Sequence, residues 1–154
     1  LGPMVNPAFP KNQLVGVFSL ELARMYGYLY QKGRSNFTIL HSLDGFDEVS
    51  LTGSVKVISK DEESIITPAA FDMQQISEIE IYGGETIEDS AAIFMNVLSG
   101  KGTATQNNVV VANAALAIKT SKKCSLNEAI TLAHNSLYSG KALQSLKTLQ
   151  SLSA

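Results

Sequence analysis

Apolar and polar positions along the first third of the chain predict two strands with a helix between them. Residues 13–18, QLVGVF, and residues 37–42, FTILHS, are short apolar runs typical of buried strands. Between them, Ser19 is a typical helix N-cap and Gly33 a typical helix stop. A strand, a helix and a strand within about thirty residues form a βαβ unit, whose two strands pair in parallel. The helix positions expected to form the apolar face are Leu22, Met25, Tyr26 and Leu29.

The next segments predict a hairpin followed by an ambiguous stretch. Residues 54–60, SVKVISK, and residues 63–68, ESIITP, flank an acidic connection and are expected to pair as antiparallel strands. Residues 76–84, ISEIEIYGG, fit either a strand or an irregular segment.

From Thr86 onward the pattern becomes helical. Thr86 with Asp89, and Ser125 with Glu128, are capping boxes that begin two helices. Residues 107–120 are apolar on nearly all sides, which predicts a helix covered by neighbours all round. The apolar stripes of the other helices are Ala91, Phe94, Met95 and Leu98, then Leu126, Ile130, Ala133 and Leu137, and finally Leu143, Leu146 and Leu149.

Together these elements predict a mixed α/β fold with a largely parallel sheet flanked by helices and a helical C-terminal third. A chain of 154 residues is about one domain, so we expect a single α/β domain over residues 1–154. Its parts are an extended Gly/Pro loop over residues 1–10, a sheet-forming half over residues 11–84 and a helical part over residues 86–152.

Composition narrows the functional classes. The chain has 12 basic and 14 acidic residues, so it lacks the positive charge expected of a protein that binds nucleic acid or anionic lipid. No apolar run approaches the length of about 18 residues that spans a membrane. Cys124 is the only cysteine, which excludes an internal disulfide and favours a reducing, cytoplasmic setting. We therefore expect neither a nucleic-acid partner nor a membrane partner.

The stretch HSLDGFDEVSLTG, residues 41–53, places three acids and two glycines directly after a predicted buried strand. Ligands of open α/β sheets bind beyond the carboxyl ends of the strands, and this stretch begins at such an end. The adjacent carboxylates of Asp47 and Glu48 suit Mg²⁺, which is held by one or two carboxylates together with substrate phosphates. From the residues alone two interpretations stay open, a solvated turn and a cation site.

Other metals fit this stretch less well. A calcium loop of about twelve residues that starts at Asp44 would end at Val55, where a glutamate is needed. His41 and His134 have no Cys or His at the spacing of a zinc site. Of the metals considered, Mg²⁺ agrees best with the residues present.

Several blocks of this sequence occur together, in this order and spacing, in one enzyme family. They are LGPMVNPA, QLVGVFS, DGFDEVSLTG, GGETIEDSAAIFMNVLSGKG and NAALAI. The chain from Leu1 to about Lys141 strongly resembles anthranilate phosphoribosyltransferase. The resemblance implies a catalytic domain of the nucleoside phosphorylase/phosphoribosyltransferase type and a Mg²⁺-dependent, cytoplasmic glycosyltransferase of tryptophan biosynthesis. It also implies that anthranilate and phosphoribosyl pyrophosphate are the substrates, and that a homodimer forms through an N-terminal helical domain.

The resemblance assigns four site residues. Asp47 and Glu48 match the pair that helps hold Mg²⁺ against the pyrophosphate. Gly2 and Pro3 match a loop that lies against the aromatic ring of anthranilate. None of the residues in this chain is assigned as a catalytic acid, base or nucleophile.

Three other functions compete with this one. A pyrimidine-nucleoside phosphorylase of related fold is disfavoured, because the pair Asp47 and Glu48 belongs to the Mg²⁺-dependent branch, and assays with anthranilate and thymidine would separate the two. A non-enzymatic relative that binds nucleic acid is disfavoured by the net charge of −2. The last is a structural fragment that packs on an N-terminal domain without a ligand of its own.

The chain is expected to be a fragment with little or no activity. A glycine-rich phosphate loop resembling GTGGD and a stretch resembling KHGNR, which the family carries upstream, are absent from it. Without that half of the phosphate clamp, affinity for a polyanionic substrate should fall. The measurement is the rate at which the purified chain consumes anthranilate in the presence of phosphoribosyl pyrophosphate and Mg²⁺. Full turnover without any added N-terminal part would contradict this expectation.

Overall fold

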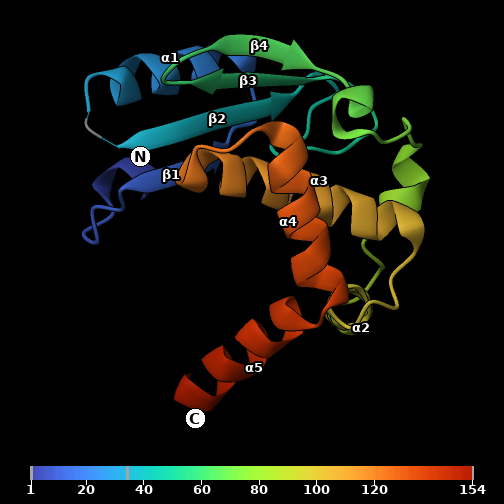
Figure 1. Ribbon diagram of the computed structural model, residues 1–154. Helices are drawn as coiled ribbons and strands as arrows, with labels where there is room; N and C mark the ends of the chain where they lie inside the picture. The colour runs from blue at the N-terminus through green and yellow to red at the C-terminus, as the bar shows by residue number, and fades with distance from the viewer. Residues whose placement is uncertain (1, 34, 154) are drawn as a thin grey trace.

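The computed structural model describes residues 2–33 and 35–153 (Figure 1). Leu1 and Ala154, the end residues of the predicted single domain, lie outside the described residues. With η for a 3-10 helix, the elements are η1 (Gly2–Val5), β1 (Asn12–Gly16), α1 (Leu20–Gln31), β2 (Asn36–Ser42), β3 (Val55–Ser59), β4 (Glu63–Ile66), η2 (Pro68–Phe71), η3 (Glu78–Ile81), α2 (Ile87–Leu98), α3 (Ala104–Lys122), α4 (Leu126–Tyr138) and α5 (Lys141–Ser153).

Four strands form one sheet in the order β1-β2-β3-β4. β1 pairs with β2 in parallel, from Asn12 opposite Asn36 to Gly16 opposite Leu40, whereas β2–β3 and β3–β4 are antiparallel. The mixed α/β fold, the βαβ unit and the hairpin are therefore confirmed, but the sheet is not largely parallel over the described residues. Parallel neighbours need a long crossover, and among the described helices α1 alone connects two strands of this sheet.

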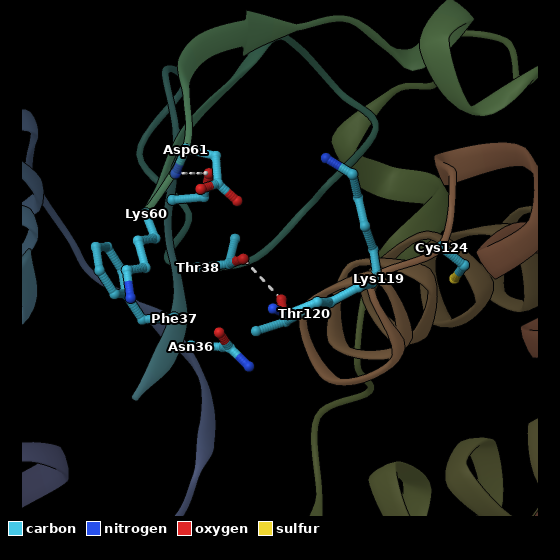
Figure 2. Close-up of a pocket in the computed structure, with 10 residues that line it drawn as sticks. Asn36, Phe37, Thr38, Lys60, Asp61, Lys119, Thr120 and Cys124 are labelled. Carbon is cyan, nitrogen blue, oxygen red and sulfur yellow. Dashed lines mark hydrogen bonds between the residues drawn. The ribbon is translucent and has the colours of Figure 1, made fainter. Parts of the chain in front are cut away.

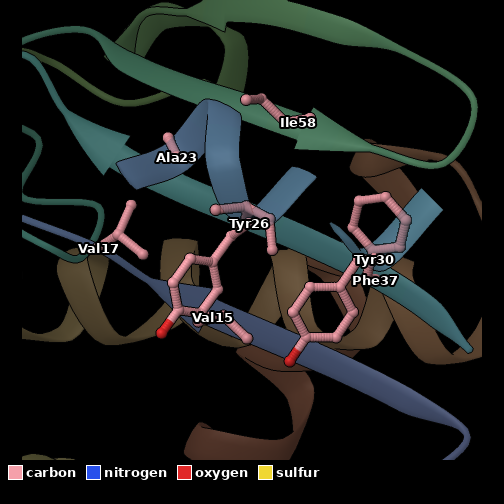
Figure 3. Packing of buried hydrophobic residues seen from close by; sticks show 8 residues of the cluster. Val15, Val17, Ala23, Tyr26, Tyr30, Phe37 and Ile58 are labelled. Atoms are coloured by element: carbon pink, nitrogen blue, oxygen red, sulfur yellow. The ribbon is translucent and has the colours of Figure 1, made fainter. Parts of the chain in front are cut away.

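Helices cover both faces of the sheet (Figure 1). α1 packs against β2 and β3 on one face, and α3 packs against β1 and β2 on the other. β2 is buried over residues 37–42 because its side chains alternate between these two layers. Toward α1, the Phe37 and Tyr30 rings lie 5.4 Å apart between centroids (Figure 3). Leu40 belongs to a second cluster that includes Leu116 of α3.

The buried face of α1 differs from the predicted stripe. Met25 and Leu29 are 53% and 43% exposed. Gly27 lies so close to the sheet that a Cβ there would be 2.9 Å from Ile58 Cγ2. Small residues let a helix approach a sheet closely. The face of α1 that packs on the sheet is therefore the one that contains the small residues Ala23 and Gly27. Its members are Ala23, Tyr26, Gly27 and Tyr30.

The C-terminal third is helical, as predicted, and α4 and α5 extend away from the sheet (Figure 1). α3 packs against α4, whose predicted positions Ala133 and Leu137 are buried. The predicted cover of α3 on all sides is wrong, since Val110 is 41% exposed. In α2, Phe94 of the predicted stripe is 52% exposed and Val97 is the buried residue. The sheet, η3 and α4 contact only part of the surface of α3. Some apolar side chains of α3 are therefore left uncovered by the described elements.

The local signals along the chain are reproduced more closely. The side chains of Ser19, Thr86 and Ser125 each accept a backbone N–H of the following first turn, as predicted for N-caps. Residues 76–84, which were ambiguous, contain the short η3 and are otherwise irregular. In the part of the chain that the structure describes, every helix is too short or too polar to cross a membrane.

Replacing Ile39 by alanine tests the core of the sheet. Ile39 is 0% exposed. Its truncation removes buried apolar surface and leaves a cavity, which should lower the free energy of unfolding by about 2–5 kcal/mol. Ile65 of β4 is 57% exposed, so Ile65→Ala is the matched control, with an expected loss below about 1 kcal/mol. Chemical denaturation measures both losses, and equal losses would contradict this description of the core.

The capping box of α4 should make stability depend on pH. Hydrogen bonds from the Ser125 hydroxyl and backbone N–H to the Glu128 carboxylate lower the pKa of Glu128 below its ordinary value of 4.5. A carboxyl with a lower pKa in the folded state binds fewer protons there, so its stabilisation is complete above about pH 5 and is lost as pH falls through the lowered pKa.

Glu128→Gln retains the geometry of the cap and does not titrate. The difference in unfolding free energy between wild type and this variant should therefore shrink from about pH 5 to about pH 3. Denaturation curves recorded at a series of pH values measure it. A difference that stays constant over this range would show that the cap does not contribute through the charge of Glu128.

Candidate functional site

The acidic turn connects β2 to β3 over residues 43–54. Because β1 and β2 run parallel, their carboxyl ends at Gly16 and Ser42 lie at the same edge of the sheet, and the turn starts there. Ligands of open α/β sheets bind at such an edge. The turn borders a cavity of about 300 Å³ at this edge, lined by Leu14, Gly16, Leu40, Asp47, Glu48 and Asn113.

The three acids of the turn have different surroundings. Asp44 accepts a hydrogen bond from the Thr52 hydroxyl and lies next to Gly53, where a Cβ would be 3.0 Å from Asp44 Oδ2. Asp44 thus joins the two ends of the turn. Asp47 and Glu48, the acidic pair, are exposed, and within the described residues neither carboxylate makes a hydrogen bond or an ion pair. Their oxygens are available to a ligand.

Contacts to the two parallel strands hold the backbone of the acidic pair. A Cβ on Gly16 would lie 1.7 Å from the Asp47 carbonyl oxygen, so a side chain at this position would displace the turn. Ser42, at the end of β2, donates a hydrogen bond from its hydroxyl to the Glu48 carbonyl oxygen at 2.5 Å. The backbone is therefore fixed while the two carboxylates remain free.

Sequence reasoning missed two residues of this site, Gly16 and Asn113. Asn113 lies on α3, and its side-chain amide bonds to the backbone of Val49, the residue after Glu48. Its signal in the sequence is a polar residue inside an apolar run, which suggests a buried hydrogen bond but does not name the partner. Gly16 lies inside the apolar run QLVGVF, and no local pattern places it against the acidic turn.

The residues predicted to contact anthranilate lie elsewhere. Gly2 and Pro3 belong to η1, and Pro3 lines a separate cavity of about 360 Å³. That cavity also includes Gln13, Leu29, Tyr30 and Gly33. Gln13 is near the amino end of β1, about 10 Å along the strand from its carboxyl end. The structure therefore does not bring Gly2 and Pro3 together with the acidic pair.

A further cavity of about 250 Å³ lies between the start of β2, the β3–β4 connection and the end of α3 (Figure 2). Several of its polar groups are partnered within the protein. The Thr38 and Thr120 hydroxyl oxygens are 2.6 Å apart, and Lys119 Nζ lies 2.8 Å from Glu62 Oε1. Cys124 lines this cavity and packs against the α3–α4 cluster, which agrees with a structural cysteine.

The donors at the acidic pair fit Mg²⁺. Both side chains supply oxygen ligands, and they sit next to each other on a braced turn. Among the described residues, no group of three or more His, Cys, Asp or Glu side chains is arranged to hold a metal alone. Mg²⁺ does not need such a group, because water and substrate phosphates complete its coordination shell.

His41 is buried, with Nδ1 2.8 Å from the Val17 carbonyl oxygen, so it holds β2 to the end of β1.

The sequence of this chain matches a family profile and several known proteins. A profile described as glycosyl transferase family, a/b domain, matches residues 1–143. Anthranilate phosphoribosyltransferase of Flavobacterium johnsoniae is 62% identical over 153 residues, which make up 99% of this chain and 46% of that protein. The protein of the same name from Christiangramia forsetii is 60% identical over 153 residues, again 99% of this chain and 46% of that protein. The chain spans about half the length of these curated relatives.

Two solved structures share the fold. Anthranilate phosphoribosyltransferase from Saccharomyces cerevisiae, in complex with phosphoribosyl pyrophosphate and Mg, has a TM-score of 0.84 at 26% identity, over 96% of this chain and 43% of that chain. The enzyme from Thermus thermophilus has a TM-score of 0.85 at 26% identity, over 96% of this chain and 44% of that chain. The resemblance that the motifs indicated is thereby confirmed. Because this family profile matches residues 1–143, the chain belongs to the glycosyl transferase family, a/b domain.

Proposed function

We propose that this chain forms the α/β portion of a cytoplasmic anthranilate phosphoribosyltransferase of tryptophan biosynthesis. In the reaction, the anthranilate amine attacks C1 of the ribosyl group, the bond from C1 to the pyrophosphate oxygen breaks, and the amine releases a proton. The observation that carries the proposal is the acidic pair, free and exposed at the carboxyl edge of the sheet. It occurs in a chain 62% identical to a protein of this name.

The acidic pair would hold Mg²⁺ close to the pyrophosphate of the substrate. When bound there, Mg²⁺ offsets the negative charge that grows on the leaving group. The chain itself contributes positioning, since Gly16 leaves room for the turn that presents the carboxylates and Ser42 bonds to its backbone. The yeast enzyme supports this proposal, because one structure is a complex with phosphoribosyl pyrophosphate and Mg and another is a complex with 4-fluoroanthranilate.

For anthranilate we propose Gly2 and Pro3, whose backbone suits close contact with a flat ring. In this structure Pro3 lines the cavity near the amino end of β1, and Val5 and Phe9 of the same segment are 69% and 84% exposed. Apolar surface that could contact a ring is therefore available there.

We further propose that residues 1–154 act as one domain in a homodimer built through an N-terminal helical domain. The apolar side chains Ile87, Phe94 and Val110 are 84%, 52% and 41% exposed. Exposed apolar surface of this kind supports contact with further protein. Neither a nucleoside phosphorylase nor a nucleic-acid-binding relative is favoured by a specific observation, and a net charge of −2 offers little to nucleic acid.

Removing the acidic pair should abolish the binding of Mg²⁺ with pyrophosphate. Calorimetric titration of the chain with both ligands should give a signal that the double variant Asp47→Ala, Glu48→Ala loses. The control is Asp61→Ala, Glu62→Ala, because these residues form another exposed, adjacent Asp–Glu pair, in the β3–β4 connection, which differs in that Glu62 pairs with Lys119. The control should bind as the wild type does.

If the chain alone does not bind, the same titration is carried out on the full-length enzyme. In the proposed enzyme, the upstream part would supply the other side of the phosphate site. Loss of binding in the acidic-pair variant, with binding retained in the control, would support the assignment. Equal binding by both variants would refute a metal role for Asp47 and Glu48.

A further inference from the structure

A side-chain amide of α3 pairs with the peptide backbone of the acidic turn. Asn113 Oδ1 accepts a hydrogen bond from the Val49 N–H at 2.9 Å, and Asn113 Nδ2 donates one to the Val49 carbonyl oxygen at 2.8 Å. These two bonds have the donor and acceptor pattern of a residue in a strand ladder. They fix both backbone polar groups of the residue that directly follows Glu48.

Asn113 is itself held in a fixed position. Its Nδ2 also donates to the Val109 carbonyl oxygen, one helical turn earlier, at 2.9 Å. Ala112 and Leu116 beside it are 0% and 3% exposed and share a core cluster with Val49, which is 2% exposed. A close-packed core of this kind resists displacement of α3 relative to the turn. Asparagine is also a poorer helix former than alanine, so helix formation does not explain its place in α3.

We propose that Asn113 is a positioning residue for the acidic pair, setting through Val49 where the two carboxylates meet Mg²⁺. This inference rests on the proposed function. Gly16 and Ser42 support the turn from β1 and β2, and Asn113 supports it from the helix layer on one face of the sheet. Asn113 lines the same cavity as the acidic pair but acts through the backbone of the turn.

Two adjacent carboxylates repel each other, and this pair has no partner among the described residues that would orient it. Their direction therefore depends on the backbone that carries them. Residues that orient metal ligands from behind typically change metal affinity or activity by about 10-fold to 100-fold when they are replaced. We expect an effect of that size from the loss of the Asn113–Val49 pair.

The test compares Asn113→Ala with Asn108→Ala in the full-length enzyme. Asn108 lies on the same helix, and its side chain makes no hydrogen bond within the described residues. Two quantities are measured: the Mg²⁺ concentration that gives half-maximal activity, and the hydrogen-exchange rate of the Val49 amide. Asn113→Ala should raise the first by about 10-fold to 100-fold and should accelerate the second. High Mg²⁺ should restore much of kcat, because the carboxylates are still present.

Each outcome bears on a different claim. A role limited to stability would lower the melting temperature and the folded fraction of Asn113→Ala without moving the Mg²⁺ midpoint, and that result would overturn the inference. If Asp47→Ala, Glu48→Ala also leaves the Mg²⁺ dependence unchanged, the proposed function fails instead. Should Asn113→Ala not fold, Asn113→Leu keeps a similar side-chain volume, makes neither bond to Val49 and adds no charge to the cavity, and the same shift in the Mg²⁺ midpoint is required of it.

Discussion

The parallel pairing of β1 with β2 is the constraint on which the rest of this structure depends. It requires the α1 crossover, and it brings the carboxyl ends of two strands to one edge. Because α1 then covers one face of the sheet and α3 the other, the side chains of β2 are buried on both faces. The largely apolar segment FTILHS meets this requirement. The acidic turn starts at this edge, beyond the carboxyl ends of the strands, where ligands of open α/β sheets bind.

Within that turn, structural and chemical tasks fall to different groups. Asp44 gives its carboxylate to the Thr52 hydroxyl and holds the turn together. Ser42 and the Asn113 amide hold the backbone around the acidic pair, and Gly16 lets that backbone pack against β1. Because these supports act on peptide groups, they leave the two adjacent charges exposed to solvent. A divalent cation would relieve the repulsion between those charges, so the arrangement suits the proposed Mg²⁺ site.

In the helical third of the chain, the sequence pattern predicted the helix starts better than it predicted which apolar side chains are buried. Capping boxes were predictable because they join residues three positions apart, so Thr86 with Asp89 and Ser125 with Glu128 needed no tertiary information. Which apolar positions are buried was less predictable. Gly27 lets α1 approach Ile58, and this close contact turns Met25 and Leu29 toward solvent. Some apolar side chains of α2 and α3 are not covered by the described neighbouring elements. The helical period of the sequence therefore predicted more burial than the structure has.

By itself, the sequence determined the local elements, the parallel βαβ unit and the position of the acidic turn after β2. Each of these follows from short-range patterns of side-chain polarity, capping and chain length. Tertiary structure alone decided that the hairpin pairs with β2 in antiparallel orientation and that Gly16 packs against the Asp47 carbonyl group. It also decided that Asn113 reaches back to Val49. Those contacts join residues far apart in the chain, and close packing selects them only once the layers have formed.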